Sequence, residues 1–279
     1  MAIEIRPFTL PDIPFGKMLT DAQDWHRAES DWVRLVRLEP GGAFKAVVDG
    51  IPAGTAAILS FGPVAWIHSM IVLPDFRRRG VGAALLRACL DFGERRGIPC
   101  IKLDSVDGVE PFYAHLGFRE EYPSWRLLAD GRPGTPKAIL LRPKDYPAVF
   151  AFDRERTGLD RSAALAAILR DHPDRAFVLK ARGKIRGYVI ARRGEYRDPL
   201  GPWVADPDDS AAAVDLLRSA LTAAAGQRFR MCVGGYHEAS LKIAEELGFE
   251  KAGRSTRMYR GTAFTETRAC FAMISAEKG

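Results

Sequence analysis

The stretch that decides the fold is Arg77-Arg78-Arg79-Gly80-Val81-Gly82-Ala83. An apolar run over 65–73 comes before it, and residues 81–96 follow with apolar side chains at helical spacing, so the stretch joins a strand to a helix. Because glycine has no Cβ, the backbone here can turn tightly and approach a ligand closely. The first amides of the helix have no partner within it, and arginines stand beside them. The stretch therefore predicts an anion site that suits a diphosphate.

Two familiar phosphate motifs do not describe this stretch. The lysine and hydroxyl of the P-loop pattern GxxxxGK[ST] are absent, and so is the GxGxxG dinucleotide pattern. Taken alone, three consecutive arginines are more typical of a solvated basic turn. The position between an apolar strand and an amphipathic helix favours the ligand site.

The two halves of the chain repeat each other in order. Gly54, in the turn of one predicted hairpin, recurs 133 residues later as Gly187. Leu-Gly-Phe at 116–118 recurs at 247–249, an offset of 131 residues, so two residues are missing from the second half. This order predicts a duplicated unit with a boundary near residue 143.

Each half is predicted to be a mixed central sheet flanked by helices, an α/β (α+β) fold. The first half, 1–142, contains predicted hairpin strands 44–48 and 55–59, strand 65–73, helix 81–96, strand 98–104 and a short helix 111–116. The second half, 143–279, contains predicted hairpin strands 177–180 and 188–191, helix 210–225, strand 229–233 and helix 238–247.

These residues resemble the GNAT superfamily of acyl-CoA N-acyltransferases. Arg77-x-x-Gly80-x-Gly82 matches the [QR]xxGx[GA] motif of that family, and Leu-Gly-Phe shortly after Tyr113 matches its closing motif. The resemblance is strong over 40–128 and fainter over 170–260, so the chain is similar to a tandem GNAT protein. It implies that two central parallel strands splay apart and that acetyl-CoA wedges between them.

The resemblance makes residues 1–142 the catalytic domain and acetyl-CoA the cosubstrate. Backbone groups of Met70, Ile71 and Val72 would pair with the pantetheine arm and stabilise the oxyanion formed from the thioester. The residues expected to hold the diphosphate are Arg77, Arg78, Arg79, Gly80, Val81, Gly82 and Ala83. The chain has Val106 where the family often has an asparagine that contacts pantetheine.

The same resemblance gives Tyr113 the role of general acid near the departing sulfur. In the second half, Ala244 stands in the corresponding place, and the loop has become Asp208-Asp209-Ser210-Ala211, which is shorter, acidic and without glycine. Carboxylates repel a phosphate. We therefore interpret residues 143–279 as a degenerate GNAT-like domain that does not bind CoA.

An amine acceptor must lose a proton before it attacks, and two residues are candidates for the base. His68 shares the face of Met70 if the strand is regular, and some arylalkylamine acetyltransferases carry a histidine at this place. Asp104 follows at the end of the next strand. A structural role is the alternative for each of them, and Glu110 and His115 are expected at the surface.

The segment 24–32 is polar and aromatic and is predicted to lie within an early helix. The resemblance implies that this region covers the acceptor pocket, so Trp25 and His26 are candidate substrate contacts. Helix packing by Trp25 and Trp32, seven residues apart on one face, is the alternative. The sequence leaves open whether the acceptor is a small molecule or a peptide amine, and it leaves the oligomeric state open.

The composition narrows the classes of protein and of partner that fit this sequence. The 279 residues carry a net charge of +6 and are 47% hydrophobic, which is typical of a soluble globular protein. No apolar run approaches the ~18 residues of a membrane helix, and no signal peptide is seen, so we expect a cytoplasmic protein without a membrane partner. The basic excess is too diffuse for nucleic acid. The four cysteines form no CxxC pair, so no metal is expected.

The leading hypothesis is therefore an N-acetyltransferase in which a primary amine attacks acetyl-CoA directly. Dispersed cysteines without an evident histidine partner make an acyl-enzyme less attractive. A non-catalytic acyl-CoA-binding regulatory module is the alternative. A binder of nucleic acid or another anionic surface, using Arg77–Arg79, is a third hypothesis.

Overall fold

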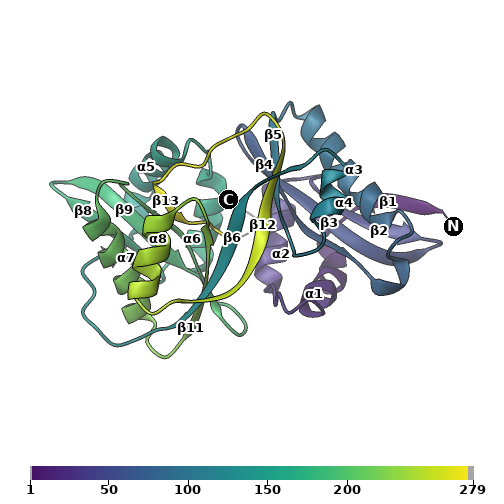
Figure 1. Ribbon diagram of the computed structural model, residues 1–279. Coiled ribbons are helices and arrows are strands. Elements are labelled where there is room, and N and C mark those ends of the chain that lie inside the picture. Colours follow the sequence, from purple (N-terminus) through teal and green to yellow (C-terminus); the bar gives the residue numbers. More distant parts are fainter. Residues whose placement is uncertain (1, 276–279) are drawn as a thin grey trace. The chain divides into compact units, whose positions relative to one another are not determined.

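The computed structural model describes residues 2–275, which form two compact units (Figure 1). Among the described residues, unit 1 comprises 2–103 together with Tyr259–Ala263, and unit 2 comprises Asp104–Met258 and 264–275. Each unit is a mixed sheet with helices, as the sequence predicts.

Unit 1 contains a sheet in the order β1-β2-β3-β4-β5. The first four strands are antiparallel neighbours, and β5 runs parallel to β4. Its elements are β1 (Ile3–Pro7), α1 (Ile13–Asp21), α2 (Glu29–Leu38), β2 (Ala43–Val48), β3 (Ile51–Phe61), β4 (Val64–Val72), α3 (Val81–Arg95) and β5 (Cys100–Ser105), with short 3-10 turns at Leu10–Asp12 and Pro74–Phe76. The last two residues of β5 lie in unit 2.

Helix α3 packs closely on this sheet. Of the face predicted from the spacing, Val81, Leu85 and Phe92 are buried and Ala88 is half-buried, and Leu86 and Cys89 are fully buried as well. Gly93 permits the approach, because a Cβ there would lie 2.7 Å from Cδ1 of Ile101 on β5. The helix that follows the glycine-arginine loop is thus fixed firmly at its apolar face.

Unit 2 contains the sheet order β12-β6-β11-β10-β9-β8-β7, and β13 pairs with β10. Its strands are β6 (Arg119–Asp130), β7 (Ile139–Leu140), β8 (Ala176–Ala181), β9 (Lys184–Ala191), β10 (Asp198–Ala205), β11 (Arg228–Gly234), β12 (Glu250–Gly261) and β13 (Cys270–Ala272). Its helices are α4 (Glu110–Ala114), α5 (Tyr146–Thr157), α6 (Ser162–Asp171), α7 (Ser210–Ala223) and α8 (Glu238–Glu246), with a 3-10 turn at Pro143–Asp145.

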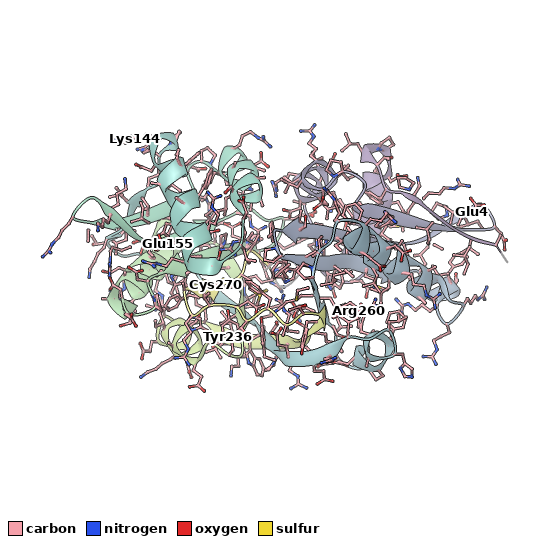
Figure 2. All side chains as sticks on the ribbon, turned by 90° about the horizontal axis from the view of Figure 1, so that it is seen from above. Glu4, Lys144, Glu155, Tyr236, Arg260 and Cys270 are labelled. Atoms are coloured by element: carbon pink, nitrogen blue, oxygen red, sulfur yellow. The ribbon has the colours of Figure 1, made fainter. Side chains whose placement is uncertain are left out.

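The core of unit 2 is built from the inner faces of β10, β11 and α7. Trp203, Leu216 and Met231 are completely buried there. Lys144 and Glu155, by contrast, are exposed beside α5 (Figure 2). The unit thus has a hydrophobic core of its own.

The compact units differ from the sequence halves because β6 and the end of β12 join the unit of the other half. β6 comes from the first half but pairs with β11 over seven residue pairs, from Ser124–Gly234 to Asp130–Arg228. β12 comes from the second half and is the neighbour of β5, and its residues Tyr259–Gly261 belong to unit 1. A repeat read from sequence spacing does not reveal which sheet each strand joins.

The described residues include no helix long and apolar enough to cross a membrane. The four cysteines form no disulfide: Cys89, Cys100 and Cys270 are buried and Cys232 is half-buried. Burial raises the pKa of Cys89 and Cys270 above the usual thiol value, which makes both sulfurs poor nucleophiles.

His237 joins helix α8 to the chain that leads into β13. Its Nδ1 accepts a hydrogen bond from the backbone N–H of Ser240 (3.2 Å), and its Nε2 donates to the carbonyl of Arg268 (2.7 Å). Both bonds together require the neutral ring with its proton on Nε2. Desolvation lowers the pKa of His237 from its ordinary value of 6.5, although the carbonyl of Arg268 acts in the opposite direction.

This lowered pKa predicts a stability that depends on pH. The unfolded state binds the proton more readily, so the contribution of His237 is complete above pH 6.5 and is lost as the pH falls from there toward the folded pKa. The slope from one proton is at most about 1.4 kcal/mol per pH unit. Urea unfolding at pH 7.5 and 5.5 should show a smaller pH difference for His237→Gln than for the wild type. Equal differences would contradict this assignment.

Candidate functional site

A bulge interrupts β4 at the residues expected to meet the pantetheine arm. Thr55 pairs with Ile71 and Ala57 pairs with His68, so two residues of β4 stand opposite one residue of β3. Ser69 occupies the left-handed region at φ +52°, and its carbonyl accepts a hydrogen bond from Oγ1 of Thr55 (2.9 Å). Bulges of this kind bend a strand and redirect its backbone groups.

The parallel ladder between β4 and β5 is short. It joins Val64–Trp66 to Cys100–Lys102, and β4 then continues to Val72 without further pairs in that ladder. Met70 and Val72 are half-buried, whereas Ile71 is buried. The strand edge from the bulge onward thus has the course expected of splayed parallel strands.

The loop after β4 runs directly into the start of helix α3. Nε of Arg77 donates to the carbonyl of Val72 (3.0 Å), which ties the loop back to the strand. Arg78 and Gly80 have φ of +62° and +83°, and Gly80 is the N-cap of α3. The left-handed conformation at this cap is easiest for glycine.

These features fit a diphosphate. In the first turn of α3, the amide of Ala84 bonds to the carbonyl of Gly80 (3.0 Å), and the amides of Val81, Gly82 and Ala83 are the ones without a partner inside the helix. The side chains of Arg77–Arg79 are exposed beside them. Outward amides, a positive helix end and guanidinium groups together attract an anion.

His68 lies just before the bulge and is buried, with 3% of its surface exposed. Its Nδ1 is 3.1 Å from Oγ of Ser69. Because the bulge breaks the alternation of the strand, His68 and Met70 are not related as two residues of a regular strand, and Met70 is the more exposed of the two. His68 is expected on the face of Met70 only if the strand is regular, and the strand is not regular here.

Tyr113 lies on the short helix α4 of unit 2 and is 8% exposed. Its ring packs edge-on against Phe112 and Phe118, with centroids 5.1 and 6.0 Å away. The expected surface residues near it differ from each other: His115 is exposed and Glu110 is only half-exposed. The glycine-arginine loop belongs to unit 1, so a catalytic role for Tyr113 stays a prediction.

Asp104 forms a buried ion pair with a residue that the sequence did not single out. Its Oδ2 is 3.0 Å from a terminal nitrogen of Arg257 on β12, and both side chains are almost completely inaccessible. Burial alone would lower the pKa of Arg257, but the charge of Asp104 outweighs it and the pKa lies above its usual value. The ring of Tyr122 lies 5.9 Å from the guanidinium.

This ion pair bears on the role of Asp104 as a base. A carboxylate held by a buried guanidinium would give up part of that interaction on taking a proton. Arg257 could have been found only by predicting that β12 lies beside β5, since 153 residues separate the two charges in the chain.

The prediction of a helix over 24–32 is wrong in its first part. Helix α2 begins at Glu29, and the preceding connection has positive φ at Asp24 (+54°) and His26 (+43°). Trp25 is half-buried in this connection and cannot share a helix face with Trp32. Trp32 does pack in the core, stacked on Phe8 at 5.1 Å.

His26 lies among carboxylates in the same connection. Its Nδ1 is 3.9 Å from Asp21 and its Nε2 is 3.7 Å from Asp24. These groups are partly solvent-exposed, so the segment could meet a cationic acceptor, and the roles of Trp25 and His26 as substrate contacts stay predictions.

The corresponding loop of unit 2 is occupied by internal ion pairs. Arg186 contacts both Asp206 (2.8 Å) and Asp209 (2.9 Å), and Arg156 contacts Asp206 (2.7 Å). Oδ1 of Asp209 accepts the backbone N–H of Ala212 at the start of α7 (3.0 Å). That amide and then Arg186 lower the pKa of Asp209, so its carboxylate is charged.

Replacing Asp209 with alanine should therefore weaken α7. Loss of the N-cap is expected to lower the free energy of unfolding by about 1 kcal/mol, whereas Asp209→Asn, which can still cap, should lose less. Urea denaturation of both variants measures the difference. If both variants lost the same free energy of unfolding, the ion pair of Asp209 with Arg186, and not the N-cap hydrogen bond, would be responsible for the loss.

Comparison with known proteins agrees with the repeat. The profile of the acetyltransferase (GNAT) family matches residues 6–118, and that of an acetyltransferase (GNAT) domain matches residues 149–270. An uncharacterized N-acetyltransferase of Methanocaldococcus jannaschii is 31% identical over 118 residues, which cover 38% of this chain and 51% of that protein. The match thus spans about half the length of this curated relative.

Solved structures share the fold along nearly the whole chain. A candidate acetyltransferase from Pyrococcus horikoshii superposes with a TM-score of 0.83 at 23% identity, over 99% of this chain and 96% of that one. A tandem GNAT protein from the clavulanic acid biosynthesis pathway gives 0.67 at 18% identity, over 95% and 100%. At these identities the likeness shows the fold alone. With a GNAT match in each half and the same architecture throughout, the chain belongs to the GNAT family and carries two GNAT units in tandem.

Proposed function

We propose that the chain is an N-acetyltransferase that moves an acetyl group from acetyl-CoA to a primary amine by direct attack. The observation that carries the proposal is the succession of a bulged β4, a short β4–β5 ladder and a glycine-capped α3 within unit 1. It supplies a strand that continues beyond its parallel ladder and is followed by a helix N-terminus, in the order that a long thioester with a diphosphate requires.

The coenzyme, when bound, would supply an activated thioester, and the chain would position it. Backbone groups of Met70–Val72 would align the pantetheine arm and stabilise the oxyanion. Amides of Val81–Ala83 and the side chains of Arg78 and Arg79 would hold the diphosphate, while Arg77 would brace the loop through its bond to Val72. The name of the archaeal relative, an N-acetyltransferase, supports this reaction class.

Proton transfers would complete the reaction. The acceptor amine would lose a proton to His68, to Asp104 or to water, and Tyr113 would donate one to the departing sulfur. The ion pair with Arg257 makes Asp104 the costlier base, which leaves His68 or a water molecule as the simpler route. The buried thiols of Cys89 and Cys270, with their raised pKa values, favour direct attack over an acyl-enzyme.

We infer in addition that the coenzyme site belongs to the first repeat, 1–142, and that the second repeat, 143–279, has none. Asp209 already caps α7, and two arginines neutralise the carboxylates of that loop. Binding a diphosphate there would require that carboxylate to leave.

Calorimetry with acetyl-CoA and thiol release with a panel of amines test the proposal on the purified full chain. One equivalent of acetyl-CoA and amine-dependent thiol release are expected. Binding without thiol release from any amine would favour a regulatory acyl-CoA-binding module. No binding would overturn the proposal, and salt-sensitive binding to duplex DNA in its place would favour an anionic-surface binder.

A further inference from the structure

Unit 2 also has a short parallel ladder, between β10 and β11, and beyond it another strand of the chain, β13, pairs with β10. β10 pairs with β11 from Asp198–Phe229 to Leu200–Met231, and β13 then pairs antiparallel with β10, Trp203 opposite Ala272 and Val204 opposite Cys270. We call residues 267–275 the C-terminal segment. In unit 1 the equivalent strand edge is the one proposed for the pantetheine arm.

Backbone hydrogen bonds connect the C-terminal segment to both parallel strands. The N–H of Ala205 on β10 donates to the carbonyl of Ala269 (3.1 Å). On the other side, the N–H of Met273 donates to the carbonyl of Cys232 on β11 (3.1 Å). The segment therefore lies between β10 and β11 and uses the backbone groups that an extended ligand would use.

Side-chain packing leaves no room for another occupant. Trp203 is fully buried and its ring lies 4.8 Å from that of Phe271, which is itself 1% exposed. Gly201, with φ of +144°, passes so close that a Cβ would lie 2.0 Å from the carbonyl oxygen of Met273. Oγ of Ser240 donates to the carbonyl of Phe271 (2.5 Å).

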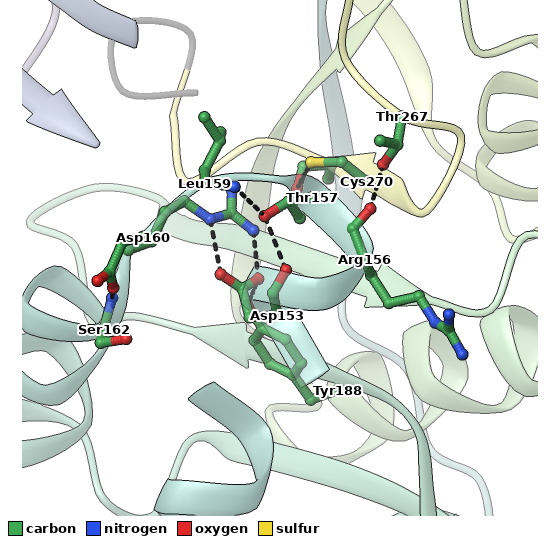
Figure 3. Close-up of polar contacts among 11 residues, drawn as sticks. Asp153, Arg156, Thr157, Leu159, Asp160, Ser162, Tyr188, Thr267 and Cys270 are labelled. Carbon is green, nitrogen blue, oxygen red and sulfur yellow. Dashed lines mark hydrogen bonds and ion pairs between the residues drawn. The ribbon is translucent and has the colours of Figure 1, made fainter. Parts of the chain in front are cut away.

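A buried polar cluster anchors the start of the segment (Figure 3). Arg161 forms two bonds to Asp153 (2.6 and 3.1 Å), and the hydroxyl of Tyr188 donates to the same carboxylate (2.6 Å). Next to this cluster, Oγ1 of Thr267 donates to the carbonyl of Arg156 (2.6 Å), and Cys270 lies at its edge. The charges of Arg161 and Asp153 are thus paired with each other beside the start of the C-terminal segment.

We propose that the C-terminal segment is a built-in substitute for the pantetheine arm in unit 2, with the carboxylate of Asp209 in the place of the diphosphate. Each half of the coenzyme thus has a counterpart from the chain: an extended backbone between β10 and β11, and an anion on the first turn of α7. The correspondence rests on the coenzyme site proposed for unit 1. Unit 2 then keeps the fold of a liganded GNAT unit without coenzyme.

Hydrogen exchange on the full chain tests this substitute. Amides in 201–207 and 269–275 should be protected before any addition and should not change when saturating acetyl-CoA is added. Amides in 67–73 should gain protection from acetyl-CoA. Unprotected amides in 269–275, loss of their protection on adding acetyl-CoA, or two bound equivalents would overturn the substitute. If acetyl-CoA did not change the exchange of amides in 67–73, the result would count against the proposed function. Constant protection of the amides in 201–207 and 269–275 would still support the substitute.

A mild variant separates the segment from the general stability of the unit. Ser240→Ala removes the hydroxyl that donates to Phe271, so amides in 269–275 should exchange about fivefold faster. Thr265→Ala, at an exposed position just before the segment, is the control and should not change them. Equal exchange in both variants, with the segment unprotected, would contradict the proposal.

Discussion

Replacing Tyr113 with phenylalanine is expected to lower turnover about 10²–10⁴-fold and to leave the affinity for acetyl-CoA nearly unchanged. The substitution removes only the hydroxyl, so the ring should keep its edge-on packing against Phe112 and Phe118. A departing thiolate of pKa ~8.5 gains from a nearby proton donor. Steady-state thiol release gives the turnover, and calorimetry gives the affinity.

Tyr146→Phe is the matched control for this prediction. It removes a hydroxyl from another tyrosine of unit 2, whose ring packs beside Phe150. Its turnover should equal that of the wild type. If Tyr113→Phe also retained full turnover, the proton would have to come from elsewhere and Tyr113 would be only a packing residue.

Gly82→Val should reduce the affinity for acetyl-CoA on the order of 100-fold, which corresponds to about 2.7 kcal/mol. Gly82 is the second residue of α3, where a branched side chain would keep a phosphate away from the first-turn amides. Each hydrogen bond to a charged group is worth about 1.5–3 kcal/mol, so the loss of one or two is sufficient. Calorimetry with acetyl-CoA measures the change.

Asp91→Val provides the comparison for the helix itself. It places the same branched side chain at an exposed position further along α3, and by helix propensity neither substitution should weaken the helix. Only Gly82→Val should lose affinity. An unchanged affinity in Gly82→Val would show that the first turn of α3 does not hold the diphosphate.

Much of the fold could be predicted because it depends on local spacing. The run before the glycine-arginine loop is β4, and the helical pattern after it is α3, each within a residue or two of the expected bounds. The hairpins and helices of the second repeat are also confirmed. These elements follow from periodicity and from glycine at turns, which neighbouring residues determine.

The features that sequence reasoning missed depend on distant contacts or on single dihedral angles. No local pattern shows that Arg257 meets Asp104, or that Cys270 and Ala272 pair with β10. The bulge at Ser69 rests on one residue with positive φ. The connection before α2 is not helical, although its polar and aromatic residues are compatible with an amphipathic pattern.

The placement of the end of β12 in unit 1 has a consequence for the synthesis of the protein. Residues 2–103 leave the ribosome well before Tyr259–Ala263, which complete the same unit. At a rate of synthesis of about 5–20 residues per second, β5 has no β12 beside it for roughly ten to thirty seconds. An open edge strand invites pairing with other nascent chains. A product that stops at residue 142 would keep that edge permanently, so the two repeats depend on each other from synthesis onward.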